Sequence, residues 1–258
     1  MAALQVVLVG AGVGFLLGLT SLGGGSLLTP ILILFLRVDP VLAVGSDLVY
    51  QAVTRVAGVA VHVRQQAVDR RILVRLAAGS VPGAIIAGVL THGLHAQLSS
   101  RAVLGMLGIA LMLTALTIGL EPILRRRRAE GEPRRIGRGR TGLTVAAGLL
   151  VGLCVGVTSV GAGSLAMSLV VIIYPHLTGR RLVGTDLAHG VVLLPISALV
   201  AFKAGHVDLG LVAQLLIGSV PGVIVGSRLS ARLPERPLRL TVAGMLLATG
   251  LRLLPVGL

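Results

Sequence analysis

The chain of 258 residues is 55% hydrophobic and 12% charged, with a mean hydropathy of +0.98. Soluble domains carry about 25% charged residues, so this composition excludes that class and indicates a polytopic membrane protein. The formal charge of +14 would suit nucleic acid, but the chain has no Trp, two Tyr and three Phe for base stacking, so we expect no nucleic-acid partner. The bilayer is the expected surrounding instead.

The first segment, residues 2–36, contains no charged residue. As one helix it would be about 50 Å long, against about 30 Å for the hydrocarbon core of a bilayer. The run Gly23-Gly24-Gly25 disfavours a continued helix, because glycine loses the most backbone entropy. The sequence therefore predicts a helix, a break and a shorter helix, which either crosses as a broken helix or folds back as a re-entrant hairpin.

Three segments of about the length of a spanning helix complete the first half. They are residues 39–61, 73–91 and 102–120. Residues 121–141 follow with eight arginines, Pro and Gly, which predicts a basic cytoplasmic linker. We therefore divide the chain into a first membrane repeat over 1–120, the linker, and a second membrane repeat over 142–258.

The second half repeats the first. Most of the glycine-rich stretch at 10–30 recurs 138 residues later at 148–168, with Gly10, Gly14 and Gly18 matched by Gly148, Gly152 and Gly156. Glycine at every fourth position puts small residues on one helix face and lets another backbone approach closely. The remaining apolar segments of this half are expected at 185–202, 209–227 and 238–254. The fold class predicted is all-α, with two homologous halves that each have one glycine-broken helix and three spanning helices.

The two breaks are the first candidate binding site. A helix end exposes backbone N–H groups with positive dipole character, and small hydroxyl side chains add neutral donors, so a small anion is the natural partner. Matching interrupted helices in two halves are typical of a transporter's binding site. Each hydroxyl could instead bond to its own helix, and the glycines could serve packing alone. The candidate substrate-binding residues are Thr20, Ser21, Gly23, Gly24, Gly25, Ser26, Thr158, Ser159, Gly161, Gly163 and Ser164.

Charged residues inside apolar segments form a second candidate group, for ion coupling or gating. Asp47 and Asp186 occupy equivalent positions, and His189 lies within one helical turn of Asp186. Either aspartate could carry a coupling proton or cap a helix N-terminus, since each follows Gly-Ser or Gly-Thr. Arg55, about two turns beyond Asp47, could bind an anion, pair with Asp47, or extend to the membrane surface.

The distribution of Lys and Arg predicts the relative orientation of the halves. With the linker inside and four crossings in each half, six basic residues fall inside and eight outside. With both glycine-broken elements re-entrant, ten fall inside and four outside, which satisfies the positive-inside rule. This count favours inverted repeats, with both breaks near the midplane.

The duplicated motifs resemble the TauE/SafE-type sulfite exporter family. The resemblance rests on TSLGGGSLLTP and TSVGAGSLAMS, on Gly-Ser-Asp and Gly-Thr-Asp at residues 45–47 and 184–186, and on two Ser-Val-Pro-Gly motifs, and it covers nearly the whole chain. It implies a bacterial inner-membrane exporter of a small anion such as sulfite or an organosulfonate, coupled to an ion gradient. The intramembrane aspartates make H⁺ the candidate coupling ion. We expect no enzyme activity, cofactor or metal site, and a homodimer stays open. A membrane scaffold subunit and an anion channel are the alternatives.

Overall fold

The described part of the chain is entirely helical. The computed structural model describes residues 3–20, 25–62, 68–93, 100–129, 138–174, 177, 179–230 and 235–257. Within these ranges there is no strand, and the helices follow one another as α1 (Ala3–Thr20), α2 (Gly25–Leu34), α3 (Pro40–His62), α4 (Arg70–Gly88), η2 (Val89–Gly93), α5 (Ser100–Ala129), α6 (Arg138–Thr158), α7 (Ser164–Ile173), α8 (Gly179–Lys203), α9 (Leu209–Ser230) and α10 (Glu235–Gly257). The all-helical prediction is confirmed.

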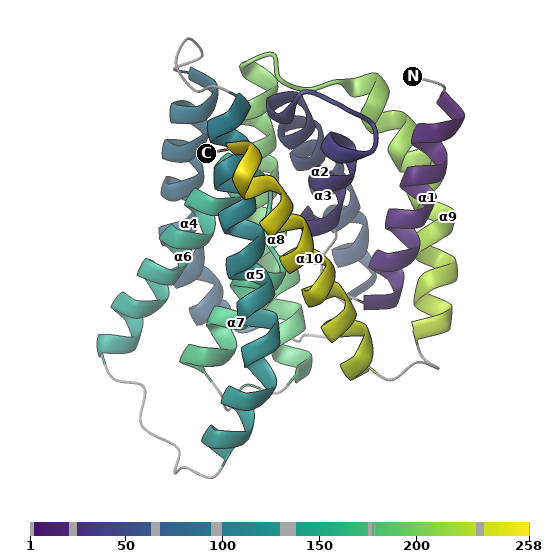
Figure 1. Cartoon of the computed structure of the whole chain (residues 1–258). Helices are drawn as coiled ribbons and strands as arrows, with labels where there is room; N and C mark the ends of the chain where they lie inside the picture. Colours follow the sequence, from purple (N-terminus) through teal and green to yellow (C-terminus); the bar gives the residue numbers. More distant parts are fainter. Residues whose placement is uncertain are drawn as a thin grey trace.

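The glycine stripe of α1 packs closely against α9, a helix of the second half. Gly10 lies against the backbone of Leu215, and Gly14 lies against the backbone of Ser219, so that a Cβ atom at either glycine would overlap a carbonyl group of α9. Both contacts advance by four residues in the same sense, and α1 and α9 are therefore parallel. They lie side by side at the right-hand edge of the molecule in Figure 1.

The equivalent contact joins α6, the glycine-rich helix of the second half, to α4 of the first half. Gly148 lies against Leu76 and Gly152 against Ser80, again through backbone atoms and again in parallel. Leu76 and Ser80 are the counterparts of Leu215 and Ser219 at the repeat offset of 139 residues. Each glycine-broken helix thus packs on a helix of the opposite half, and α4 and α6 occupy the left-hand edge in Figure 1.

Two hydrogen bonds repeat this exchange between the halves. The backbone N–H of Asp208 donates to Ser46 Oγ at 3.0 Å, and the N–H of Asp69 donates to Thr185 Oγ1 at 2.9 Å. Ser46 and Thr185 are equivalent positions, as are Asp69 and Asp208. The halves are therefore interlocked through reciprocal contacts at the starts of α4 and α9.

Equivalent helices run in opposite directions. Gly108 of α5 lies against both Gly250 and Leu254, and Gly250 lies against Met112, so α5 and α10 cross the front of Figure 1 antiparallel. On α3 and α8, Arg55 pairs with Asp186 near the start of α8, whereas Gly45 lies against the residue at 206, just past its end. These two helices are antiparallel as well.

The directions show how each glycine-broken element is folded. Figure 1 shows that α8 ends and α9 begins at the upper end, so α9 runs opposite to α8 and in the direction of α3. Because α1 is parallel to α9, α1 and α3 also run in the same direction, although only α2 lies between them. The chain must therefore return through α2, whose ten residues are about 15 Å long, half of a hydrocarbon core. The α1–α2 element folds back rather than crossing as a broken helix. In the second half, Asp69 contacts Thr185 and Ser80 contacts His189, so α8 runs parallel to α4 and therefore to α6, and the chain returns through α7.

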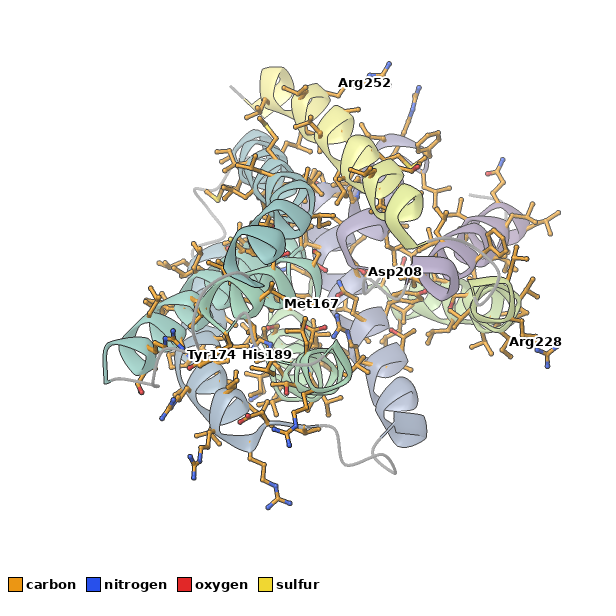
Figure 2. All side chains as sticks on the ribbon, turned by 90° about the horizontal axis from the view of Figure 1, so that it is seen from below. Met167, Tyr174, His189, Asp208, Arg228 and Arg252 are labelled. Atoms are coloured by element: carbon orange, nitrogen blue, oxygen red, sulfur yellow. The ribbon has the colours of Figure 1, made fainter. Side chains whose placement is uncertain are left out.

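The outer surface is apolar. Leu116 of α5, Ile217 of α9 and Leu240 of α10 are 57%, 66% and 61% exposed. Five helices of the described chain are long and apolar enough to cross a membrane. Arg228 and Arg252 extend away from the helices at the periphery in Figure 2, whereas His189 lies among them. This distribution suits a bundle surrounded by lipid.

The helix bounds differ from the predicted segments mainly around the linker. Helix α5 extends to Ala129 and α6 begins at Arg138, so helix occupies part of the range 121–141. Arginine is a good helix former, and its charge ended the apolar segment without ending the helix.

Two glycines of α1 provide a test of this packing. We expect Gly14→Ala to lower the thermal unfolding midpoint of the purified protein, because the added methyl group would overlap Ser219 and relieving such an overlap costs about 1–3 kcal/mol. Gly12→Ala is the matched control, since nothing lies within 4 Å of a Cβ atom at Gly12. Equal midpoints for the two variants would contradict the close α1–α9 contact.

Candidate functional site

The second break is formed by five residues between α6 and α7. Helix α6 ends at Thr158, and Ser159 takes a left-handed backbone conformation with φ of 62°. That conformation is uncommon for a residue with a side chain and costs of the order of 1–3 kcal/mol. Gly161 follows with φ of 107°, which glycine adopts readily. Two left-handed residues end the helix and redirect the chain into α7.

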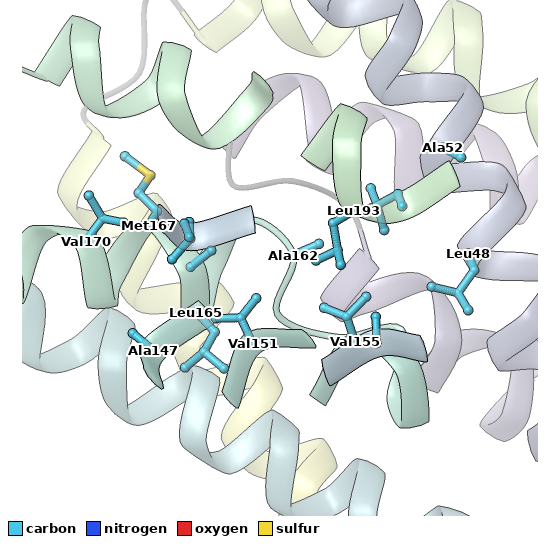
Figure 3. Packing of buried hydrophobic residues seen from close by; sticks show 14 of the residues in the cluster. Leu48, Ala52, Ala147, Val151, Val155, Ala162, Leu165, Met167, Val170 and Leu193 are labelled. Atoms are coloured by element: carbon cyan, nitrogen blue, oxygen red, sulfur yellow. The ribbon is translucent and has the colours of Figure 1, made fainter. Parts of the chain in front are cut away.

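Protein side chains cover this break. Ala162 is 1% exposed and lies among Val155, Leu165 and Leu193 in Figure 3. Irregular backbone at membrane depth is tolerated only where protein or a water-filled cavity surrounds it. The break is therefore an interior feature of the bundle.

The carboxylate of Asp47 joins the break to the first half. Its Oδ2 accepts hydrogen bonds from Thr29 Oγ1 of α2 at 2.5 Å and from Ser159 Oγ at 2.7 Å. Gln51 Nε2, one turn along α3, donates to Ser159 Oγ at 2.6 Å and to Ser159 O at 3.0 Å. The carbonyl and hydroxyl oxygens of Ser159 are thus both engaged, and its N–H donates to Val155 O, which together hold its left-handed conformation. We call Thr29, Asp47, Gln51 and Ser159 the Asp47 cluster.

The two aspartates predicted as possible helix caps do not cap helices. Asp47 lies in the interior of α3, which begins at Pro40, and Asp186 lies in the interior of α8, which begins at Gly179. The side chain of Asp39 caps α3 instead, accepting from the N–H groups of residues 41 and 42. Proline suits the first helical position, because the N–H group that it lacks would have no partner there. The helix start at Asp39-Pro40 therefore precedes the start that Gly-Ser-Asp at residues 45–47 predicted. The capping alternative is wrong for both residues.

Arg55 pairs with the aspartate of the other half. Its Nη1 lies 3.2 Å from Asp186 Oδ2 and donates to Asp186 O at 3.4 Å, and the two side chains are 7% and 12% exposed. A Cβ atom at Gly190 would lie 2.7 Å from the same nitrogen, so the guanidinium rests on this glycine. The alternatives in which Arg55 pairs with Asp47 or extends to the membrane surface are wrong. We call Arg55, Asp186, His189, Gly190 and Ser80 the Arg55 cluster.

His189 completes the Arg55 cluster from the next turn of α8. Its Nε2 lies 2.7 Å from Ser80 Oγ of α4, while Nδ1 is buried without a partner in the described chain. The equivalent residue of the first half is Tyr50, whose hydroxyl is likewise buried without a described partner. Asp186 Oδ1 is buried in the same way. Three buried polar atoms, His189 Nδ1, Tyr50 Oη and Asp186 Oδ1, thus lie without a partner in the described chain.

The predicted hydroxyl residues have different surroundings. Thr158 Oγ1 donates to Cys154 O at 2.7 Å and accepts from the N–H of Val160, so it serves its own helix end as the alternative held. Ser159 belongs to the Asp47 cluster, and Ser164 begins α7 at 3% exposure. Gly163 precedes α7 without a side-chain cap.

In the first break, fewer predicted residues can be placed. Ser21, Gly23 and Gly24 lie outside the described residues, as do the side-chain surroundings of Thr20, Gly25 and Ser26.

Four residues of the clusters, Thr29, Gln51, Ser80 and Gly190, were not predicted from the sequence. Ser80 belongs to a duplicated Ser-Val-Pro-Gly motif, and that duplication was the available signal. Thr29 and Gln51 have no polar counterpart in the second half, where Met167 and Gly190 stand. Within the described residues, no three His, Cys, Asp or Glu side chains gather in a way that could hold a metal ion.

Comparison with known proteins decides the family. The family description for the sulfite exporter TauE/SafE matches residues 6–253. The chain belongs to this family. A TauE/SafE protein with two duplicated, glycine-broken elements and an apolar exterior is a multi-pass bacterial membrane transporter.

Two relatives from Bacillus subtilis (strain 168) match nearly the whole chain. The probable membrane transporter protein YjnA is 37% identical over 255 residues, covering 98% of this chain and all of its own length. The probable membrane transporter protein YdhB is 24% identical over 254 residues, covering 94% of this chain and 98% of its own length. No solved structure matches the chain significantly.

The Arg55–Asp186 pair generates a stability prediction. We expect Arg55→Leu or Asp186→Leu alone to lower the free energy of unfolding by about 3–5 kcal/mol, because either change leaves an uncompensated buried charge. The double variant should lose less than either single variant, since no bare charge remains. Denaturant titrations in detergent measure this, with Arg252→Leu at the exposed periphery as the control. Additive losses in the double variant would contradict the pairing.

Proposed function

We propose that this TauE/SafE protein is a secondary transporter that exports a small sulfur-containing anion such as sulfite or an organosulfonate. The anion would bind at the two glycine-broken elements near the membrane midplane, and its movement would be coupled to an ion gradient. The observation that carries the proposal is the buried, uncapped start of α7 at Gly163 and Ser164. Family membership supports the transporter class, and the chemistry of the break supports an anion.

The start of α7 offers donors of the kind that an oxyanion needs. Of the first four residues, the N–H groups of Ala166 and Met167 donate to Gly161 O and Gly163 O. The N–H groups of Ser164 and Leu165 have no partner within the described chain, and the hydroxyl of Ser164 lies beside them. Two amides, a hydroxyl and the positive end of a helix dipole would bind a sulfite or sulfonate group without a fixed charge that retains it.

Arg55 supplies a cation whose charge is already balanced. Its partner Asp186 leaves one carboxylate oxygen unpaired, and His189 leaves one ring nitrogen unpaired. An anion that approached Arg55 would compete with Asp186, so the pair could open and close during transport. We assign Asp47, Arg55, Asp186 and His189 to coupling or gating on this basis.

The reciprocal contacts between the halves support an inverted repeat. The antiparallel pairs α3–α8 and α5–α10 are equivalent helices, as expected for a two-fold axis in the membrane plane. The basic residues at 121–141 would lie in the cytoplasm. Movement of the helices about the two breaks would then expose the anion site to each side of the membrane in turn. A homodimer and the absence of enzyme activity stay predictions.

Ser164 provides the test of the binding site. We expect Ser164→Ala to raise the KM for sulfite or sulfoacetate efflux about tenfold, because a hydrogen bond to a charged group contributes about 1.5–3 kcal/mol. Efflux would be measured from proteoliposomes loaded with sulfite, sulfoacetate, thiosulfate or sulfate. Ser197→Ala is the matched control, since the Ser197 hydroxyl is also buried but donates to Leu193 O of its own helix.

The outcomes separate the alternatives. Saturable efflux with a KM raised only by Ser164→Ala supports a carrier with its site at α7. Efflux that does not saturate with concentration would favour a channel. No flux of any of the four anions through folded wild-type protein would contradict the proposed substrate class and favour a scaffold.

A further inference from the structure

We propose that Asp47 is the binding site of the coupling ion, that this ion is a proton, and that the proton resides on Oδ1 in the conformation described. The inference rests on the proposed transport function and names the ion that drives it. Its starting observation is a difference between two equivalent residues. Asp186 has an arginine beside it, and Asp47 has none in the described structure.

The surroundings of Asp47 contain only neutral partners. The side chain is 0% exposed, with Oδ2 bonded to Thr29 and Ser159 and Oδ1 without a partner in the described chain. From its own helix, Tyr50 and Gln51 face the same region. None of these side chains carries a positive charge.

The charged groups of the neighbouring helices are engaged elsewhere. On α8, Asp186 contacts Arg55 and His189 contacts Ser80. Arg181 and Lys203 are exposed near the two ends of α8, and His206, just past that helix, lies against Gly45. On α9, Arg228 is exposed at the periphery. Helices α5, between residues 102 and 119, and α7 have no titratable acid or base in their sequences. An ionised Asp47 would therefore be an isolated buried charge.

A proton removes that charge at the atom that lacks a partner. Burying an ionised carboxylate without a cation costs far more than burying the neutral acid, so this conformation favours an O–H bond at Oδ1. Oδ2 then acts as the carbonyl oxygen and accepts from the two hydroxyl groups, as observed. Asp186 needs no proton, because Arg55 compensates it.

The protonated side chain of Asp47 joins the two re-entrant elements. Thr29 belongs to α2, the returning arm of the first element, and Ser159 belongs to the break of the second, five residues before the start of α7. Neutral Asp47 holds both together in the apolar interior. When the proton leaves, the bare carboxylate favours a conformation that admits water, so the elements separate and the α7 start opens with them. Proton release and anion release are thereby coupled.

Infrared spectroscopy tests the proton site without any substrate. A buried protonated carboxyl group gives a C=O stretching band distinct from that of carboxylates, and it shifts in heavy water. We expect this band in wild-type protein at neutral pH and in Asp186→Asn, and its loss in Asp47→Asn. Asp47→Glu should move the band without abolishing it, which keeps the test valid if Asp47→Asn does not fold. A band that persists unchanged in folded Asp47→Asn would overturn the proposal.

Flux measurements test the coupling. An imposed proton gradient should accelerate sulfite or sulfoacetate flux by wild-type protein, and in Asp47→Asn the rates with and without the gradient should become equal. Asp39→Asn is the matched control, because Asp39 is an acid at an exposed helix start, and it should keep the acceleration. Acceleration of Asp47→Asn by the gradient, or a sodium dependence lost in that variant, would overturn the proton assignment. Absence of flux in the wild type would contradict the transport function, and the infrared band alone would then decide whether Asp47 holds a proton.

Discussion

The close backbone packing of α1 on α9 and of α6 on α4 is the constraint on which the rest of the structure depends. Gly10, Gly14, Gly148 and Gly152 bring helix backbones into direct contact, and no other residue fits there. A broken helix leaves backbone groups unpaired, and lipid cannot satisfy them. Because each glycine-broken helix is held by the opposite half, both folded-back elements can be enclosed by protein. The same exchange makes the two halves mechanically dependent on one another.

Duplication gave the chain two equivalent interior aspartates, and the surrounding residues now differ. In the second half a glycine at position 190 makes room for the Arg55 guanidinium, which neutralises Asp186. In the first half the equivalent position is Gln51, which bonds to Ser159 and leaves Asp47 with neutral partners. One aspartate therefore belongs to a charge pair and the other to a hydroxyl cluster. Such an asymmetry allows one half to respond to an anion and the other to a proton.

The sequence predicted the fold well because its signals were compositional and repeated. We could infer the apolar segments, the second break at 159–163 and the family. Glycine and charge act on the structure close to where they stand in the sequence, and the duplication makes each motif visible twice. The clusters could not be predicted, because Arg55 and Asp186 are 131 residues apart and meet only through the packing of α3 on α8. The cap signal failed for Asp47 since Asp39-Pro40 starts the helix earlier. Gln51 and Thr29 left no signal, because the duplicated half lacks them.

An anion bound at the start of α7 should be exposed to the two sides of the membrane in turn. Cys154 is the single cysteine of the chain, so a Cys154→Ser, Ser164→Cys protein carries one reporter thiol at the proposed site. Labelling of that thiol by a membrane-impermeant reagent would be measured from each side of sealed vesicles, without sulfoacetate and with sulfoacetate at a concentration raised enough to offset the loss of the Ser164 hydroxyl. We predict labelling from both sides and protection by sulfoacetate from both. A thiol that no reagent reaches from either side, or that sulfoacetate does not protect, would contradict the account.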